Sequence, residues 1–220
     1  MKPIRQTLLI TSTLVMLAGC GSSDPSGNGN SVNVAPADVN PCDILGDKVL
    51  HAHFSIADGT VIERSKSKHS MHPLCTASWK KPNAAELEKK SSEAMMEYIR
   101  KKSRGEDVKI PITRTTNEVT LTLNKSLFEN ASAAQAALDS SMKVLSEGIT
   151  RKHNGVEVTF QADVIPVEGV GDKAAWAAKL RQLSVADGKR VFHLTVNTGG
   201  DREQELIKAK ELAQDLVKSL

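Results

Sequence analysis

The chain has 220 residues, of which 29 are lysine or arginine and 26 are aspartate or glutamate, giving a formal net charge of +3. This length suits one domain with enough chain to bury a core. The near-balance of charge excludes the strongly basic surface typical of nucleic-acid-binding proteins. Aromatic residues make up only 3% of the chain, which argues against a carbohydrate-stacking cleft or a cytochrome-like pocket.

The first nineteen residues have the pattern of a signal peptide. Lys2 and Arg5 give a positively charged start, Thr7–Met16 is mostly apolar, and Leu17-Ala18-Gly19 supplies small residues for cleavage. The apolar run is shorter than the ~20 residues that span a bilayer as a helix. Because Cys20 follows directly, the stretch resembles the bacterial lipobox; the alternative is an ordinary secretory signal with a chance cysteine. The resemblance implies a diacylglycerol thioether on Cys20, cleavage before it and N-acylation, which together give firm membrane anchoring.

The residues after the cleavage site predict where the protein goes and how it is held. By resemblance to enterobacterial lipoproteins, Gly21 after the cysteine favours the periplasmic leaflet of the outer membrane. In a cell without an outer membrane, the same anchor leaves the protein on the outer face of the plasma membrane. Residues 20–39 comprise the cysteine that the resemblance implies is lipidated and a stretch rich in Gly, Ser, Asn, Asp and Pro, whose composition predicts a flexible tether. Residues 40–220 form the predicted domain.

The domain begins with a predicted helix and a predicted strand. Asn40 suits a helix cap and Pro41 the first helical position, and Ile44, Leu45 and Val49 share one apolar face. Gly59 and the polar run of residues 63–70 indicate a loop or hairpin. Residues 73–80 alternate between two faces, with Cys75, Ala77 and Trp79 on one of them, which predicts a strand.

Two cysteines remain once Cys20 is lipidated. Cys42 and Cys75 would meet an oxidising compartment, and a single pair leaves no ambiguity of connectivity, so we expect a disulfide between the first helix and the first strand. The alternative is a redox-active or metal-binding pair, but the Cys-x-x-Cys spacing typical of such sites is missing.

Four histidines lie near the two cysteines in the sequence and could bind a metal ion. His51 with His53 and His69 with His72 have spacings that can share Zn or Cu. Solvated loop histidines are the favoured interpretation, because no third ligand stands at a fixed spacing and lysines neighbour His69. We therefore expect no cofactor, with a periplasmic metal-binding protein as an alternative function.

The middle of the chain predicts a helix, a strand and a second helix. Asn83 and Glu86 form a capping-box pattern for a helix that Gly105 ends, and its Met95-Met96 pair is expected to pack in the core rather than to form a binding surface. Residues 119–123 alternate as a half-buried strand. Asn130 suits the cap of a second helix, which ends at residue 148.

The last third predicts a strand, a turn, a hairpin and a closing helix. Residues 156–164 alternate as a strand with one buried face, and Gly169 and Gly171 predict a tight turn. The third glycine of a nucleotide-binding loop is missing. Two alternating runs flank Asp187-Gly188, which predicts a hairpin, and Asp201 with Gln204 suits the cap of an amphipathic final helix.

An envelope hydrolase is a further alternative function. Asp163, Asp172, Ser184 and His193 are residue types that could build a catalytic site. No sequence spacing joins them, so we assign no catalytic residue and expect a non-enzymatic protein.

The order of these elements resembles that of bacterial envelope lipoproteins in families of unknown function. The resemblance rests on Pro41-Cys42-Asp43-Ile44-Leu45, on Cys75 followed by Trp79, and on Gly169 to Trp176, and it spans most of the mature chain. We predict a single α+β domain with a twisted antiparallel sheet, with amphipathic helices on one face and at its ends. The predicted role is a lipid-anchored accessory or binding module for a protein, glycan or lipid of the envelope.

Overall fold

The structure, a computed structural model, describes residues 39–67, 72–153 and 156–220. The predicted signal peptide, Cys20, His69 and all but the last residue of the predicted tether lie outside the described residues. The helices are α1 (Pro41–Ile44), α2 (Asp47–His53), α3 (Ala84–Ser103), α4 (Ala131–Glu147) and α5 (Arg202–Ser219). The strands are β1 (Glu63–Lys66), β2 (Leu74–Lys80), β3 (Thr116–Leu123), β4 (Ile149–His153), β5 (Val156–Phe160), β6 (Val164–Val167), β7 (Lys173–Ala177), β8 (Gln182–Asp187) and β9 (Arg190–Asn197).

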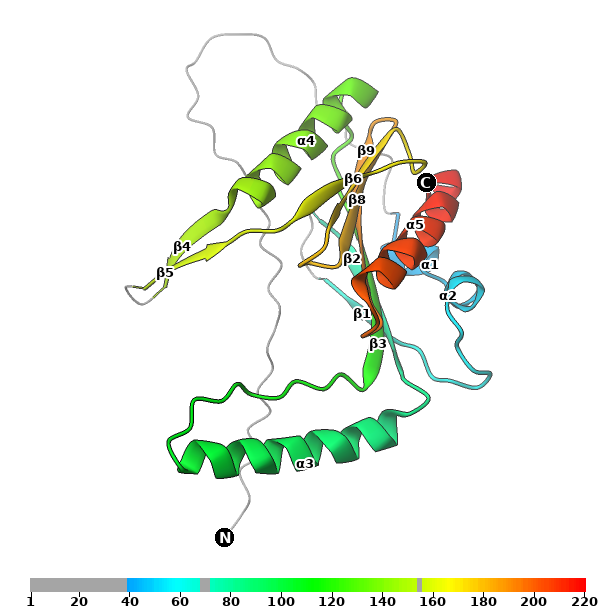
Figure 1. The fold of residues 1–220 in the computed structure, drawn as a ribbon. Helices are drawn as coiled ribbons and strands as arrows, with labels where there is room; N and C mark the ends of the chain where they lie inside the picture. The colour runs from blue at the N-terminus through cyan, green and yellow to red at the C-terminus, as the bar shows by residue number, and fades with distance from the viewer. Residues whose placement is uncertain (1–38, 68–71, 154–155) are drawn as a thin grey trace. The chain divides into compact units, whose positions relative to one another are not determined.

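Seven of the strands form one antiparallel sheet in the order β1-β2-β3-β9-β8-β7-β6, and β4 and β5 form a separate two-stranded sheet (Figure 1). The predicted α+β class is therefore confirmed. The predicted hairpin around Asp187-Gly188 joins β8 to β9, with Asp187 opposite Arg190. The polar run after Gly59 forms the edge strand β1, which pairs with β2.

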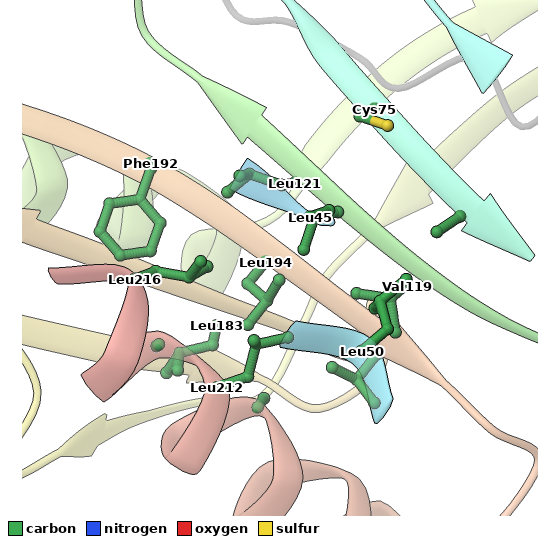
Figure 2. Packing of buried hydrophobic residues seen from close by; sticks show 14 of the residues in the cluster. Leu45, Leu50, Cys75, Val119, Leu121, Leu183, Phe192, Leu194, Leu212 and Leu216 are labelled. Carbon is green, nitrogen blue, oxygen red and sulfur yellow. The ribbon is translucent and has the colours of Figure 1, made fainter. Parts of the chain in front are cut away.

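One face of the large sheet carries the main core. Side chains from β2, β3, β8 and β9 alternate inward there and pack with the buried faces of α1, α2 and α5. Figure 2 shows this packing, in which Leu45 after α1 and Leu50 of α2 lie in the same cluster as Leu212 and Leu216 of α5. The first and last helices of the described chain thus close the same core.

The opposite face carries a second, smaller cluster. Ala134, Leu138 and Met142 of α4 pack on Ala175, Ala186 and Val191 of the sheet. Helix α4 lies on the other side of the sheet from α5 (Figure 1). Helices were expected on one face and at the ends of the sheet, and the placement of α4 on the opposite face differs from this, because its small inward residues let it pack closely on β7 and β8.

Side-chain caps explain where two of the helices begin. The Asn40 side chain accepts a hydrogen bond from Cys42 N–H (3.1 Å) at the start of α1, and the Asn130 side chain accepts one from Ala133 N–H (2.9 Å) at the start of α4. The cap predicted at Asn83 is absent, because that residue has φ −101° and ψ 25° rather than the extended conformation of a capping residue. Helix α3 begins at the predicted place without it.

The strand predicted over residues 156–164 is two strands. β5 pairs with β4 alone, and β6 begins after a break and pairs with β7 at the edge of the large sheet. Val158 and Phe160 were expected to be buried, yet they are 57% and 39% exposed. β4 and β5 form a small sheet apart from the large one, and two strands alone cannot bury one of their own faces. The alternation of apolar residues in β5 therefore does not lead to burial.

The core packing predicted for Met95 and Met96 was also wrong. Met96 is 70% exposed and Met95 is 36% exposed. The one buried residue of α3 is Ala84 at its start, and the intermediate positions Leu87, Ala94 and Tyr98 mark a different side of the helix.

The predicted glycine turn before β7 is present, and Gly171 explains why it needs glycine. Its φ is +55°, in the left-handed region that other residues rarely adopt. A Cβ at this position would lie 2.7 Å from the Ala186 carbonyl oxygen. The close approach lets Asp172 N–H donate to the same oxygen (2.9 Å), which ties the turn to β8.

Candidate functional site

Opposite the main core, four neighbouring strands present polar side chains, which we call the polar face. The register places them in two rows across the sheet. One row is Thr76, Thr120, Thr195 and Gln182, and the other is Thr122, His193 and Ser184. This face lies beside the α4 cluster, since Ala186 and Val191 continue the same sides of β8 and β9.

A hydrogen-bonded group of three residues lies within the polar face. Gln182 Nε2 donates to Ser184 Oγ (3.1 Å), and Ser184 Oγ lies 2.8 Å from His193 Nδ1. Gln182 Nε2 also lies 3.2 Å from His193 Nδ1, and an amide nitrogen can only donate. We therefore assign Nδ1 as the acceptor and Nε2 as the protonated nitrogen of a neutral imidazole.

The surroundings keep the His193 ring neutral. Desolvation by burial, followed by the charge of His72, lowers the pKa of His193 from 6.5 to about 4. A neutral imidazole that accepts a hydrogen bond from a hydroxyl has the arrangement of a general base beside a nucleophile. Chemically, this is the most reactive pairing on the polar face.

The geometry does not complete a hydrolase site. Ser184 is 0% exposed, so its hydroxyl is not accessible to a substrate carbonyl in this conformation. The two aspartates of the hydrolase hypothesis lie elsewhere: Asp172 accepts a hydrogen bond from Gly188 N–H (2.8 Å), and Asp163 is exposed just before β6. The structure thus brings together Ser184 and His193 and leaves Asp163 and Asp172 apart from them.

The predicted metal-binding histidines have separate surroundings. His53 Nε2 lies 3.0 Å from Asp215 Oδ2, whose pKa is lowered by Lys218 and then by His53. His51 is exposed on α2, and His72 is near enough to affect His193 electrostatically. His69 lies outside the described residues. Among the residues that the structure describes, no three His, Cys, Asp or Glu side chains gather at a metal-binding distance.

The two cysteines meet at the end of the core. Cys42 of α1 and Cys75 of β2 are paired as a disulfide with 5.0 Å between their Cα atoms. Cys75 is fully buried and Cys42 is 6% exposed. The pair joins the first helix to the sheet, as the sequence predicted, and its burial suits a structural bond rather than an exchangeable one.

Sequence reasoning missed a buried carboxylate in α5. Glu205 is 0% exposed, pairs with Arg181, and accepts hydrogen bonds from Thr198 N–H (2.8 Å) and Gly199 N–H (3.0 Å). Asp201, which was expected to cap α5 with its side chain, makes no such bond. Arg181 has a φ of +54°, so the pair also holds a strained backbone position. An acidic residue in the first turn is a general signal, but its burial depends on the tertiary fold.

An exposed apolar group lies on α3 and the segment after it, and we call it the α3 surface. Met95, Met96, Ile99, Ile110 and Ile112 are 36%, 70%, 59%, 60% and 80% exposed. Exposed large apolar side chains are ordinary when scattered, but a group of them marks a candidate interaction surface.

The chain matches no protein-family model, no curated protein and no solved structure in comparisons with known proteins. Among the described residues, no helix has the length and hydropathy needed to cross a membrane.

Proposed function

We propose that the protein is an exported, lipid-anchored module of the cell envelope that binds a partner and does not catalyse a reaction. Export and anchoring rest on the signal-peptide pattern and on Cys20 at the end of it. The Cys42–Cys75 pair supports export, because structural disulfides persist in oxidising compartments and are rare in the cytosol.

The observation that carries the binding role is the α3 surface. Its five apolar side chains lie within eighteen residues of sequence, and the described domain leaves them in contact with solvent. Keeping such side chains exposed lowers solubility, so their presence favours a role in contact with another surface. The polar face supports the non-enzymatic part, since its Ser184–His193 pair has no accessible hydroxyl.

Intact-mass analysis of the membrane-extracted protein tests the anchor and the disulfide together. We expect a mass that starts at Cys20 and includes a diacylglyceryl group and a further acyl group. Alkylation without reductant should add nothing, and alkylation after reduction should modify Cys42 and Cys75. An unlipidated mass with two free thiols would contradict both export and anchoring.

Photo-crosslinking in intact cells tests the binding role. A photoreactive residue at Met96 should give crosslinked products, and the same residue at Val61, which is 75% exposed outside the α3 surface, is the matched control. Equal crosslinking at the two positions would argue against a dedicated binding surface.

A further inference from the structure

We propose that the α3 surface docks on the anionic lipid headgroups of the membrane in which the protein is anchored. The inference rests on the proposed lipid anchor and names the partner of the binding surface. It assigns residues 95–114 as a second, reversible membrane contact.

The charge of this segment fits an anionic bilayer. Residues 95–114 contain six basic and three acidic residues, a net charge of +3, whereas the whole chain after the predicted cleavage site carries +1. The rest of the mature chain is therefore net acidic. An anionic membrane attracts the segment and repels the remainder, which orients the domain with α3 toward the lipid.

The basic residues of the segment differ in their pairing. Glu97 pairs with Arg100 and lies 3.7 Å from Lys101, so its charge is already compensated. Lys102, Arg104, Lys109 and Arg114 form no ion pair with any described residue. These four cations remain available for phosphate groups of lipids.

The spacing of the apolar residues places them beside these cations. Ile99 lies four residues after Met95 and three after Met96, so the three share one side of α3, and Lys102 follows on that side. After Gly105 the chain has no regular secondary structure up to β3, and Ile110, Ile112 and Arg114 are exposed there while Pro111 and Thr113 between them are half-buried. Apolar side chains with neighbouring lysine and arginine are the pattern of a helix that lies in a membrane interface.

The lysine content of the α3 surface favours lipid over a protein partner. The centres of protein interfaces are enriched in aromatic residues, methionine and arginine and are depleted in lysine, so methionine fits either kind of partner and lysine fits a lipid headgroup better. The α3 surface has methionine and isoleucine with lysine around them, and its one aromatic neighbour, Tyr98, is half-buried. Because the anchor would hold the domain near the bilayer, a weak surface affinity is enough for docking.

Quenching of tryptophan by brominated lipid tests the proposal in the full chain. The native Trp79 and Trp176 are 4% and 2% exposed, so they provide a constant background. Met96→Trp reports on the α3 surface, and Val61→Trp is the matched control. Each variant is expressed in a bacterial host and purified from its cell envelope. It is then mixed with vesicles of phosphatidylethanolamine and brominated phosphatidylglycerol.

We expect the added emission of Met96→Trp to be quenched severalfold more strongly than that of Val61→Trp. Quenching should fall in high salt, with brominated phosphatidylcholine in place of the anionic lipid, and when Lys102→Glu and Arg104→Glu are combined with Met96→Trp. Circular dichroism of each variant shows whether the fold is retained.

Co-flotation with the same vesicles separates the two proposals. If the protein floats with the vesicles and Met96→Trp is not quenched, the result supports the lipid anchor and contradicts docking of the α3 surface. Quenching of Met96→Trp that survives the charge reversals would overturn the headgroup interaction. If Met96→Trp is quenched and the mass spectrum shows no acyl group, the result supports docking of the α3 surface and contradicts the lipid anchor.

Discussion

The two faces of the large sheet are built from the same strands and hold together by different means. On β9, Phe192, Leu194 and Val196 point into the main core, while His193 and Thr195 point to the polar face. The first set is removed from water by α1, α2 and α5. The second set includes a side chain held by hydrogen bonds, since His193 Nδ1 lies 2.8 Å from Ser184 Oγ. Burial of a large apolar side chain contributes more than one such bond, so we expect stability to depend mainly on the face that carries the main core.

The largest expected difference between the faces comes from truncating adjacent residues of one strand. Leu194→Ala removes a fully buried side chain and should lower the free energy of unfolding by about 4 kcal/mol. Thr195→Ala on the polar face should cost less than about 1 kcal/mol. Urea unfolding of the two variants measures both values, and equal losses would mean that the polar face is as tightly packed as the core.

The disulfide should add nearly as much to the apolar face. Cys42 and Cys75 are 33 residues apart, and chain-entropy reasoning for a loop of this length gives about 3.5 kcal/mol. Replacing both cysteines with alanine should lower the unfolding midpoint, and reductant should then have no further effect. A variant as stable as the oxidised protein would show that packing of α1 alone secures this end of the core.

The buried carboxylate of Glu205 in α5 lies on the side of the sheet that carries the main core. Glu205→Gln keeps the shape of the side chain but removes the charge that pairs with Arg181, so we expect a loss of about 2–3 kcal/mol. Glu203→Gln changes an exposed residue in the same turn and should have almost no effect. Similar losses in the two variants would point to the helix dipole rather than to the pair.

The polar face should give the smallest effect, visible as a pH dependence. The pKa of His193 is about 4 in the folded protein, against the ordinary value of 6.5 expected once the chain unfolds, so the unfolded chain binds the proton more readily between these values. Its contribution to stability is present above pH 6.5 and is lost as the pH falls through 4. We expect stability to fall between these two pH values, and His193→Gln should remove this fall from the urea-unfolding profile.

Local patterns in the sequence predicted much of this fold. The alternation in β2, β3, β8 and β9 and the caps at Asn40 and Asn130 act over a few residues, so the sequence carries them directly. The same patterns did not predict burial correctly where it depends on parts of the chain that are distant in sequence. Val158 alternates like a residue of a core strand and Met96 has helical apolar spacing, yet the two side chains are 57% and 70% exposed.

The candidate sites also differ in how far the sequence predicts them. The cysteine pair could be predicted because only two thiols remain once Cys20 is assigned to the predicted lipobox. The contact between Ser184 and His193 could not be predicted as a site, because it follows from the register of β8 on β9 and from the face on which both residues lie. Glu205 is a single acidic residue in sequence, and its partners are brought to it by the loop after β9.

The central position of β9 beside β3 has a consequence for how the chain acquires its structure. These strands are adjacent in the sheet but are separated in sequence by α4 and by β4 to β8. Their pairing must close a long loop before it gains any cross-strand contact, which slows folding relative to proteins built from local contacts. During synthesis, a ribosome-bound chain that ends before β9 lacks the strand that joins β1, β2 and β3 to β8, β7 and β6, so the large sheet cannot be completed until β9 has been made.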